Sequence, residues 1–424
     1  MSIKTIIFAV IGAIVLVQVL VFLRVLPGRN APAPASVQIS FWGADDPQLW
    51  QDILQNFQKK FPYIAVTYTQ ISKQGYEDTL VNKIAEGKGP DVFMLSNTSL
   101  IKQRDKIYPL PQGVLSFSPQ DFSSTFVDGT LQQLVLDGNI YGLPLYIDTP
   151  ILFYNKDILN TAGVAQLPTN WDDLVLLSRQ LTQKNAVGEI IKSGLSIGTS
   201  HTTSNAFEIL STLMLQEKDP TTLHIFNTDL ILGRGGDKAM AFYTSFANQV
   251  SPNFSWSDRM PNSLTAFAQT TSAFAIGFSD DIARIYAKNP HLNFNIAPFP
   301  QKKGVVIPVV YGRYFFPTVL RFSKNPIASW QFVNYLASSE GANVYVRRTG
   351  RSPARRDLLS TGPSNSYFEI LYRQALIAKS WPVPDDVATQ RLFEDAIDSV
   401  VSGIATPGDV VSTISQRVDI LFPR

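Results

Sequence analysis

The sequence predicts an α/β protein built on two separate sheets, and three observations support that prediction. The chain after residue 36 alternates strand-like and helix-like segments in the order that builds a mainly parallel sheet with helices on its faces. The same alternation begins again beyond Asp148. Two apolar stretches, 142–159 and 309–320, are interrupted by proline, which indicates segments that pass from one sheet to the other.

The elements of the first sheet follow from hydrophobic spacing. Residues 37–43 alternate like a strand and end at a glycine, whereas Leu49, Ile53 and Phe57 recur at helical spacing. The expected elements are, in chain order, a strand at 37–43, a helix at 46–61, a strand at 64–71, a helix at 76–87 and a buried strand at 91–96. This β-α-β-α-β succession predicts the first sheet.

The elements beyond Asp148 are predicted in the same way. The expected helices are 170–183, 204–217, 236–250 and one or two within 326–350, and the expected short strands are 272–278 and 294–300. The chain beyond residue 350 is expected to be helical with proline-rich joints.

The stretch 142–159 carries a carboxylate through an apolar region. Pro144 and Pro150 each remove a backbone donor, so an uninterrupted central strand is not expected there. A segment that leaves one core and enters another tolerates proline, because its middle residues pair fully with neither sheet. Asp148 is then expected to face the gap between two lobes, where water or a ligand can satisfy its carboxylate. The stretch 309–320, which Pro317 interrupts, is expected to cross in the same way.

The composition describes a folded chain of almost neutral charge. Hydrophobic residues make up 45% and charged residues 17%, which is typical of globular proteins and not of disordered ones. The formal net charge is +2 and basic runs are short, so a nucleic-acid partner is not expected; the arginines within 347–356 are interpreted as a solvated loop. Cysteine is absent, which excludes disulfides, thiolate metal sites, cysteine nucleophiles and a lipid anchor on cysteine.

Sequence signatures of catalysis are missing. The three histidines, His201, His224 and His291, show no metal-binding spacing. The stretch EGKGPD lacks the end of a phosphate-binding loop, and no serine follows the nucleophile-elbow pattern. A glycosidase that uses two aspartates is the enzymatic alternative, although no particular pair stands out. The chain is therefore expected to be no enzyme and to hold no metal or cofactor.

The N-terminal residues predict a membrane anchor. Residues 6–23 form an apolar run in which Gln18 is the only strongly polar member, and its length is at the short end for a helix that crosses a bilayer. A cleaved signal peptide, which is the alternative, normally has a shorter apolar core, and the prolines of 31–36 make a poor cleavage site. We expect residues 1–24 to form the anchor and residues 25–36 a stiff proline-rich tether.

Several motifs occur together in a particular order. They are FWGADDPQLWQDILQNFQKKFPYIAVTY, EGKGPDVFML, IYGLPLYIDTPILFYNKDIL, NWDDLVLLSRQLT, FYTSFAN, FAIGF, ARRDLL and AKSW. With these motifs the chain resembles the family 1 extracellular solute-binding proteins of bacterial ABC importers. The G-P-D-V-F and Y-G-L-P…Y-N-K-D-I-L elements are the specific ones, and the resemblance extends over nearly all of the chain that follows the tether.

The resemblance implies a type II periplasmic-binding-protein fold, in which two α/β lobes joined by three crossing segments close over a ligand. Lobe one would comprise residues 37–147 and 313–343, and lobe two residues 149–310 and 346–424. The crossings would fall near 145–150, 311–316 and 344–350. The first two coincide with the stretches that proline interrupts.

The first candidate ligand-binding residues come from strand ends and from the resemblance. Trp42, Asp45 and Asp46 follow the first strand, where open α/β sheets place ligand groups, although either aspartate can cap the next helix instead. The resemblance places Asn97 and Asp148 at polar contacts with the ligand. The alternative for Asn97 is a helix cap, and the alternative for Asp148 is a salt bridge across the crossing.

The other candidates lie in the second lobe and at its borders. By resemblance they are Asn205, Phe278, Asp280, Tyr314 and Trp381. A sugar needs hydrogen-bonding groups at its edges and aromatic plates at its faces, so the aromatic members are interpreted as platforms, with an ordinary core position as the alternative. His201 accompanies Asn205, and Arg313 and Phe315 accompany Tyr314 at the second crossing.

These features together predict a receptor that is anchored in the cell membrane with its binding domain on the extracellular or periplasmic side. It would bind a mono- or oligosaccharide between its lobes and deliver it to ABC permease subunits, acting as a monomer. Two alternatives stay open: the ligand is a peptide, a polyamine or another small solute, or the chain is a sensor or adhesin of the same fold. The apparent scarcity of cations near the cleft argues against an anionic ligand.

Overall fold

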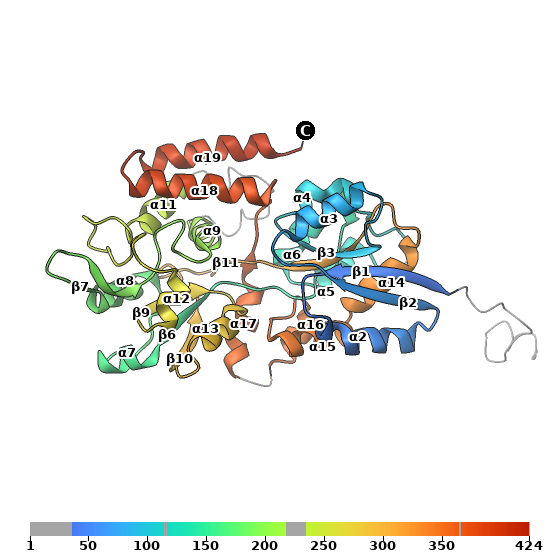
Figure 1. Cartoon of the computed structure of the whole chain (residues 1–424), viewed down its shortest axis with the longest axis horizontal. Helices are drawn as coiled ribbons and strands as arrows, with labels where there is room; N and C mark the ends of the chain where they lie inside the picture. Colours follow the sequence, from blue (N-terminus) through green and yellow to red (C-terminus); the bar gives the residue numbers. More distant parts are fainter. Residues whose placement is uncertain (1–35, 114, 116, 218–234, 364–365, 424) are drawn as a thin grey trace, which may run out of the picture.

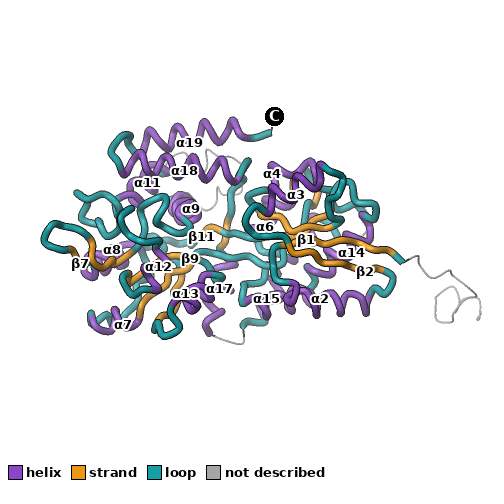
Figure 2. The backbone as a smooth tube through the Cα atoms, viewed as in Figure 1, coloured by secondary structure: helices purple, strands orange, loops and turns teal. Residues whose placement is uncertain are grey.

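The computed structural model describes residues 36–113, 115, 117–217, 235–363 and 366–423. These residues form two lobes side by side, each built on its own sheet (Figure 1). Helices cover both sheets, and long loops run between the lobes (Figure 2). The two-lobe α/β architecture expected from the sequence is confirmed.

Lobe one contains a four-stranded sheet with the strand order β12-β3-β1-β2. Its strands are β1 (Val37–Gly43), β2 (Ile64–Gln70), β3 (Val92–Ser96) and β12 (Phe315–Val319). Strand β1 runs parallel to β2 and to β3, whereas β12 is antiparallel to β3 at the sheet edge. The parallel arrangement arises because helices α2 (Pro47–Lys60) and α3 (Tyr76–Ala85) return the chain between successive strands.

Helix α2 shows how the sequence pattern becomes packing. Its buried residues Trp50, Ile53 and Phe57 lie on one face, and the Asp46 carboxylate caps its first turn by accepting the Gln48 N–H at 2.8 Å. The Trp50 ring lies edge-on to Phe41 of β1, with centroids 4.9 Å apart. This contact fixes the helix against the sheet and completes the core of lobe one.

The remaining elements of lobe one are mostly short. They are α4 (Leu100–Gln103), η1 (Arg104–Lys106), α5 (Pro119–Thr125), α6 (Asp128–Leu134), β4 (Val135–Leu136), β5 (Asn139–Ile140), α14 (Pro326–Leu336), α15 (Ser339–Thr349) and α16 (Arg356–Ser360). Helix α15 packs on α2, and α16 packs on α5 and α15.

Lobe two contains a five-stranded sheet with the order β10-β6-β9-β8-β7. Its strands are β6 (Ile151–Asn155), β7 (Gln183–Lys184), β8 (Ile190–Leu195), β9 (Ser272–Gly277) and β10 (Phe294–Pro298). Its helices are α7 (Lys156–Thr161), α8 (Trp171–Leu181), α9 (Ala206–Gln216), α11 (Gly236–Thr244), α12 (Ser263–Ala268), α13 (Asp281–Lys288), α17 (Ser366–Leu376), α18 (Asp386–Val401) and α19 (Pro407–Leu421). Helices α18 and α19 pack on α9 and α11 and lie along one side of the lobe (Figure 1).

Three segments carry the chain between the lobes, and the third of them lies between α16 and α17. Residues 142–150 lead from lobe one into β6, and β11 (Val310–Tyr311) with residues 312–314 leads back into β12. These two segments touch at Asp148 and Arg313, whose backbone N–H groups each donate to the other residue's carbonyl at 2.8 Å. The short strand β13 (Ala378–Lys379) pairs in parallel with β11 and belongs to the same region.

Two details differ from the sequence-based expectations. In 309–320 the strand is broken at 312–314, and Pro317 lies inside β12, where an edge strand tolerates the missing donor. The third passage was expected near 344–350, but residues 353–360 still contact lobe one through the bridges Tyr146–Pro353 and Phe126–Arg355 and through α16. The chain reaches lobe two only between α16 and α17, because α17 packs on β10.

Within the described part of the chain, no helix combines the length and the apolar character that a membrane crossing needs. The expected anchor, residues 1–24, and nearly all of the expected tether lie outside the described residues.

Candidate functional site

Two cavities lie where the lobes and the crossing segments meet. The wider one has a volume of about 670 Å³ and the deeper one about 200 Å³. They form one continuous site, because Lys73, Ser96, Tyr146, Phe315 and Asp386 line both. The combined volume falls in the range of small-molecule binding sites.

The crossing segments contribute alternate side chains to the cavity wall. Tyr146 and Asp148 line it from the first crossing, and Tyr311, Arg313 and Phe315 line it from the second. Successive side chains of an extended segment point to opposite sides, so residues two apart share one side. The cavity wall and the connection between the lobes are therefore made of the same residues.

The residues in between point into the protein. Ile147 and Tyr314 are fully buried, and a Cβ on Gly312 would lie only 2.8 Å from the Ile147 side chain. The end of strand β3 and the two residues after it continue the pattern, since Ser96 and Thr98 line the deeper cavity while Asn97 is buried.

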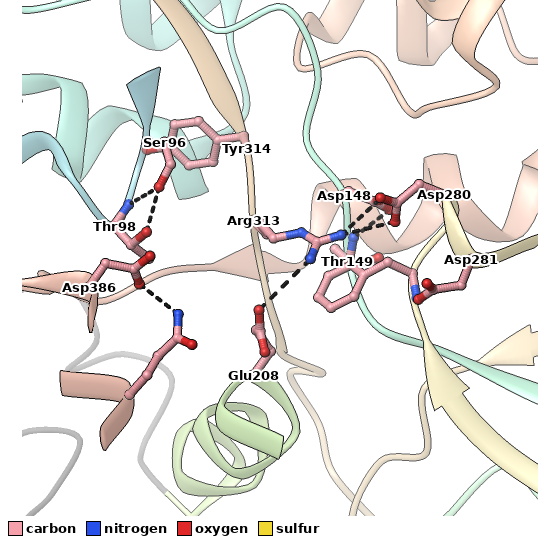
Figure 3. Close-up of polar contacts among 12 residues, drawn as sticks. Ser96, Thr98, Asp148, Thr149, Glu208, Asp280, Asp281, Arg313, Tyr314 and Asp386 are labelled. Atoms are coloured by element: carbon pink, nitrogen blue, oxygen red, sulfur yellow. Dashed lines mark hydrogen bonds and ion pairs between the residues drawn. The ribbon is translucent and has the colours of Figure 1, made fainter. Parts of the chain in front are cut away.

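The guanidinium of Arg313 organises the charges of the deeper cavity (Figure 3). Its Nη2 donates to Asp280 Oδ1 at 3.1 Å and lies 3.9 Å from Asp148 Oδ2, while its Nη1 lies 3.9 Å from Glu208 Oε1. The central guanidinium carbon, Cζ, lies 3.7 Å from the centre of the Phe278 ring, so the cation packs on the face of this aromatic ring. One cation thus faces three carboxylates.

Asp148 is held firmly although it is only 3% exposed. Ser279 Oγ donates to its Oδ2 at 2.8 Å, and the backbone N–H of Thr149 donates to its Oδ1 at 3.1 Å. Burial raises the pKa of Asp148 to about 6, and the Arg313 charge opposes that rise. Asp280 differs: burial alone would raise its pKa, but Arg313, together with Lys73, holds it below the usual value.

A second arginine closes another side of the cavity. The Arg351 guanidinium lies over the Tyr146 ring at 4.4 Å and donates from Nη1 to the Tyr345 hydroxyl at 2.6 Å. Tyr345 in turn donates to Asp45 Oδ2 at 2.9 Å, and Arg351 Nη1 lies 3.8 Å from Asp45 Oδ1. Asp45 is therefore fixed to lobe one by a charged pair and a hydroxyl.

Ion pairs also link the two lobes across the cavity mouth. Lys102 Nζ of lobe one lies 2.7 Å from Asp385 Oδ2 at the start of α18, and Lys73 Nζ lies 3.6 Å from Asp280 Oδ2. All four side chains are partly exposed, so each contact is weakened by solvent. They hold the lobes in the arrangement that encloses the cavity.

Among the described residues, no group of three or more His, Cys, Asp or Glu side chains is arranged to hold a metal ion. The chemistry of the site is that of hydrogen bonding and charge, with aromatic surface from Tyr146 and Phe315.

The family model described as bacterial extracellular solute-binding protein matches residues 43–343. The chain belongs to this family. The resemblance inferred from the sequence motifs is thus confirmed, and so is the prediction of a binding protein that is not an enzyme.

Individual relatives agree with this assignment. A protein of Brucella abortus that is named as a binding protein is 21% identical over 388 residues, which cover 88% of this chain and 90% of the relative. The maltodextrin-binding protein MdxE of Bacillus subtilis is 36% identical over 117 residues, 27% of this chain and 25% of MdxE. The sugar-binding protein MalE of Xanthomonas citri has the same fold, with a TM-score of 0.73 at 22% identity, covering 91% of this chain and 97% of MalE.

Three of the residues predicted as ligand contacts line the cavities of this solute-binding protein. Asp45 lines the wider cavity, and Asp148 and Asp280 line the deeper one. Each also has a protein partner.

Three other candidates belong to a buried network behind the cavity wall. Asn97 donates to Gln133 Oε1 at 3.0 Å, and the Tyr314 hydroxyl donates to the same oxygen at 2.9 Å. Gln133 Nε2 donates to the Trp381 carbonyl at 2.7 Å. Tyr314 and Trp381 are at most 1% exposed, so these side chains stabilise the crossing region from inside.

The remaining candidates also lie outside the cavity linings. Phe278 is fully buried beneath Arg313, and Asp46 caps α2. Trp42 is half-buried on β1 and packs against the core of lobe one. Asn205 precedes α9 with a left-handed backbone and forms no side-chain cap. The alternative stated for Asp46, a helix cap, is therefore the role that this residue has in the structure.

Sequence reasoning did not select several residues that line the site. They are Lys73, Glu77, Tyr146, Glu208, Arg351 and Asp386. Tyr146 could have been predicted from the sequence, because it lies two positions before Asp148 in an extended segment and residues two apart share one side of such a segment. The others come from helix starts and loops of both lobes, and no local pattern joins them. The expectation of few cations is wrong for the structure, since Lys73, Lys102, Lys106, Arg313 and Arg351 all line the site.

Proposed function

We propose that this solute-binding protein captures a carbohydrate in the cavity between its lobes and delivers it to the membrane subunits of an ABC importer. Residues 1–24 hold the chain at the membrane in this proposal. The names of its relatives support the ligand class, since MdxE is named for maltodextrin and MalE of Xanthomonas citri for sugar.

The observation that carries the proposal is the mixture of groups around one enclosed space. Phe315 is half-buried in the wall and offers an aromatic surface, and Tyr146 lies beside it in the linings of both cavities. Ser96, Thr98 and several carboxylates supply hydrogen-bond partners from both lobes. A sugar presents C–H groups on its faces and hydroxyls at its edges, so it matches this mixture.

The crossings give the proposal its mechanism. A ligand that touches Thr98 of lobe one and Asp280 of lobe two binds better when the lobes are close together. It therefore shifts the population toward the closed arrangement by the difference in its affinity for the two states. The importer would then recognise the closed arrangement.

A thermal-shift screen with mono- and oligosaccharides tests the ligand class. A sugar that binds the folded protein raises the apparent melting temperature, and calorimetry then gives its affinity. The variant Phe315→Ala removes the half-buried ring from the cavity wall and should weaken binding of that sugar by about tenfold, which corresponds to about 1.4 kcal/mol. Phe322→Ala is the matched control, because Phe322 is 74% exposed and lines neither cavity.

An unchanged melting temperature with every sugar tested would reject carbohydrate as the ligand class. An equal affinity of Phe315→Ala and the wild-type protein for a confirmed sugar would remove the aromatic surface from the site.

The anchor needs a separate measurement. Membrane fractions should contain the chain with its N-terminus intact, and the protein should leave the membrane only with detergent. A mature chain that begins near Ser36 in the soluble fraction would show a cleaved signal instead.

A further inference from the structure

An aromatic side chain is exposed on a turn that hydrogen bonds hold in place. Phe322 follows β12 and is 74% exposed. Before it, the backbone N–H of Arg321 donates to the Lys106 carbonyl at 2.8 Å. After it, Ser323 Oγ donates to Asp91 Oδ1 at 2.6 Å. A single exposed apolar residue is common on protein surfaces, so the surroundings of this ring decide what it can bind.

The turn lies at the end of lobe one where the N-terminal segment joins. Asn325 Nδ2 donates to the Gln38 carbonyl at 3.4 Å, so the turn is next to the start of β1. Strands β2 and β3 run parallel to β1 and begin at the same end, whereas β12 runs antiparallel and finishes there. This end is the part of lobe one that is farthest from lobe two (Figure 1).

The proposed tether limits how far this end can move from a membrane. At about 3.3–3.6 Å per residue, residues 25–36 reach about 40 Å at most. In the proposed function, the end of lobe one that carries Phe322 is therefore kept near the bilayer. Tethering raises the effective concentration of one surface near the other, so even a weak contact between them would be populated.

Cations flank the exposed ring. Arg321 and Lys324 form no ion pair with any residue that the structure describes. Arg321 uses Nη1 for the backbone carbonyl of Asp105 at 3.0 Å, which leaves other N–H donors for a partner. The Asp105 carboxylate is itself paired with Lys106 at 3.0 Å. Positive charge is thus left over on both sides of Phe322.

A third cation comes from the loop before β3. A Cβ on Gly89 would lie 3.1 Å from Leu320 Cδ2, so this loop touches the beginning of the turn. The Lys88 side chain is 72% exposed and shares the Glu86 carboxylate with Lys83, at 3.4 Å and 2.8 Å respectively. Because one carboxylate serves two lysines, this loop adds to the positive charge of the surface.

The surface of an anionic bilayer fits this combination of groups. Lysine and arginine are attracted to anionic headgroups, and an aromatic ring between them can enter the boundary between headgroups and acyl chains. A stable protein partner would need a broad apolar centre. Here the large exposed apolar side chains of the turn and of the first turn of α14 are Phe322 and Ile327, which make a small one.

We propose that this end of lobe one binds the surface of an anionic phospholipid bilayer through Phe322 and three cations, Lys88, Arg321 and Lys324. This inference rests on the membrane anchor of the proposed function and adds a second contact to it.

The contact leaves the binding cavity free. Ala44 directly follows β1 and Ser96 ends β3, and both line the wider cavity at the opposite ends of these strands. A receptor that rests on the bilayer in this way can still collect a solute. Because salt screens contacts between exposed charges, the contact is reversible and the receptor can then turn toward the importer.

A fluorescent probe beside the ring tests the contact in the whole chain. The protein has no cysteine, so Ile327→Cys provides one thiol for a nitrobenzoxadiazole label and leaves Phe322 intact. The labelled chain is reconstituted in nanodiscs of phosphatidylcholine, alone or mixed with phosphatidylglycerol, and quenching by lipids with spin-labelled headgroups is measured. Quenching should be at least about threefold stronger with phosphatidylglycerol, and added salt should remove the difference.

Matched variants assign the effect to the proposed groups. Phe322→Ala, and separately the double variant Lys88→Gln with Lys324→Gln, should each reduce the quenching by at least about threefold. Tyr286→Ala is the control, because Tyr286 is an aromatic residue of α13 in lobe two and is 46% exposed. It should leave the quenching unchanged. Each variant is checked by circular dichroism and thermal melting.

The possible results separate this inference from the proposed anchor. If the chain does not stay with the nanodiscs, the anchor is rejected and the inference fails with it. If the chain stays but the probe is quenched equally in both lipids, or equally in Phe322→Ala and its parent, the lipid contact is rejected and the anchor stands. If the probe is shielded without lipid as protein concentration rises, the surface binds a second copy of the chain and the proposal is rejected.

Discussion

The strongest test of the charge arrangement is the variant Arg313→Met. Methionine keeps most of the apolar length that lies on Phe278, but it removes the charge that Asp148, Asp280 and Glu208 share. At the observed separations, and with an effective dielectric constant of about 20, each attraction is worth about 4–5 kcal/mol before dehydration is subtracted. Removing one partner of a buried ion pair costs about 3–5 kcal/mol net.

We expect the destabilisation caused by Arg313→Met to lie at the lower end of the range of about 3–5 kcal/mol. Asp148 keeps its bonds from Ser279 and Thr149, and Asp280 keeps Lys73 and Arg284 nearby. The Arg313 side chain is 27% exposed, so solvent already weakens its contacts. The free energy of unfolding should therefore fall by about 3 kcal/mol at pH 7.5.

The loss should depend on pH in a defined direction. Without Arg313 the folded-state pKa values of these carboxyl groups rise, further above the unfolded values for Asp148 and Glu208 and upward from a lowered value for Asp280, so the folded variant binds more protons than the folded wild type. Stability is then present at low pH and is lost as pH rises through the folded pKa values. The variant should be less destabilised at pH 5 than at pH 7.5.

Urea unfolding followed by tryptophan fluorescence measures the free energy of unfolding, and repeating it at pH 5 and at pH 7.5 measures its pH dependence. Arg348→Met is the matched control, because Arg348 pairs with Asp52 on the surface and should contribute at most about 1 kcal/mol. A loss below 1 kcal/mol for Arg313→Met, or the same loss at both pH values, would refute the reasoning.

Three further predictions concern the crossing region. Asp148→Asn should reduce the decrease in stability that the wild-type protein undergoes between about pH 4 and pH 7, because the raised folded pKa of about 6 makes Asp148 stabilising only while it is protonated; melting temperatures that fall equally in both proteins would contradict this. Lys102→Met should change the free energy of unfolding by less than about 1 kcal/mol but increase the radius of gyration in small-angle scattering, whereas Lys60→Met, which breaks a pair inside lobe one, should not. Gly142→Ala should cost about 1–3 kcal/mol in chemical unfolding, because the new Cβ would lie 2.1 Å from the Phe316 ring. Gly408→Ala should cost little, because its Cβ would meet only the Thr406 hydroxyl, at an ordinary contact distance of 3.9 Å.

The sequence predicted the first five elements of lobe one to within a few residues, but it did not predict the short helices and strands between residues 100 and 140. The expected strands 37–43 and 64–71 and the expected helix 46–61 correspond to β1, β2 and α2. Local periodicity was sufficient there, because each element buries one face against a neighbour in the chain. The same reasoning overextended the helix at 236–250, where α11 ends at Thr244.

The candidate site was harder to predict, because it depends on which side of an extended segment faces the cavity. Tyr314 was expected to be a platform, but its neighbours Arg313 and Phe315 line the cavity and Tyr314 points inward. Asn97 and Ser96 differ in the same way. A shift of one position reverses the direction of a side chain, and spacing from a family motif does not fix direction to that accuracy.

Other parts of the site depend on the meeting of distant segments. Glu208, Arg351 and Asp386 are far apart in the sequence and come together only when both lobes and all crossings are in place. Hydrophobic periodicity describes how each element buries its own face, so it contains no information about which distant segments contact one another.

The alternation of the crossing segments has a consequence for how this protein can diversify. Substitutions at positions 146, 148, 311, 313 and 315 change the chemistry offered to the guest molecule, whereas their neighbours Ile147 and Tyr314 face the interior. An insertion or deletion of one residue would instead exchange the two sets, burying charges and exposing apolar groups. New specificities should thus accumulate by replacement at alternate sites, with the length of these segments preserved.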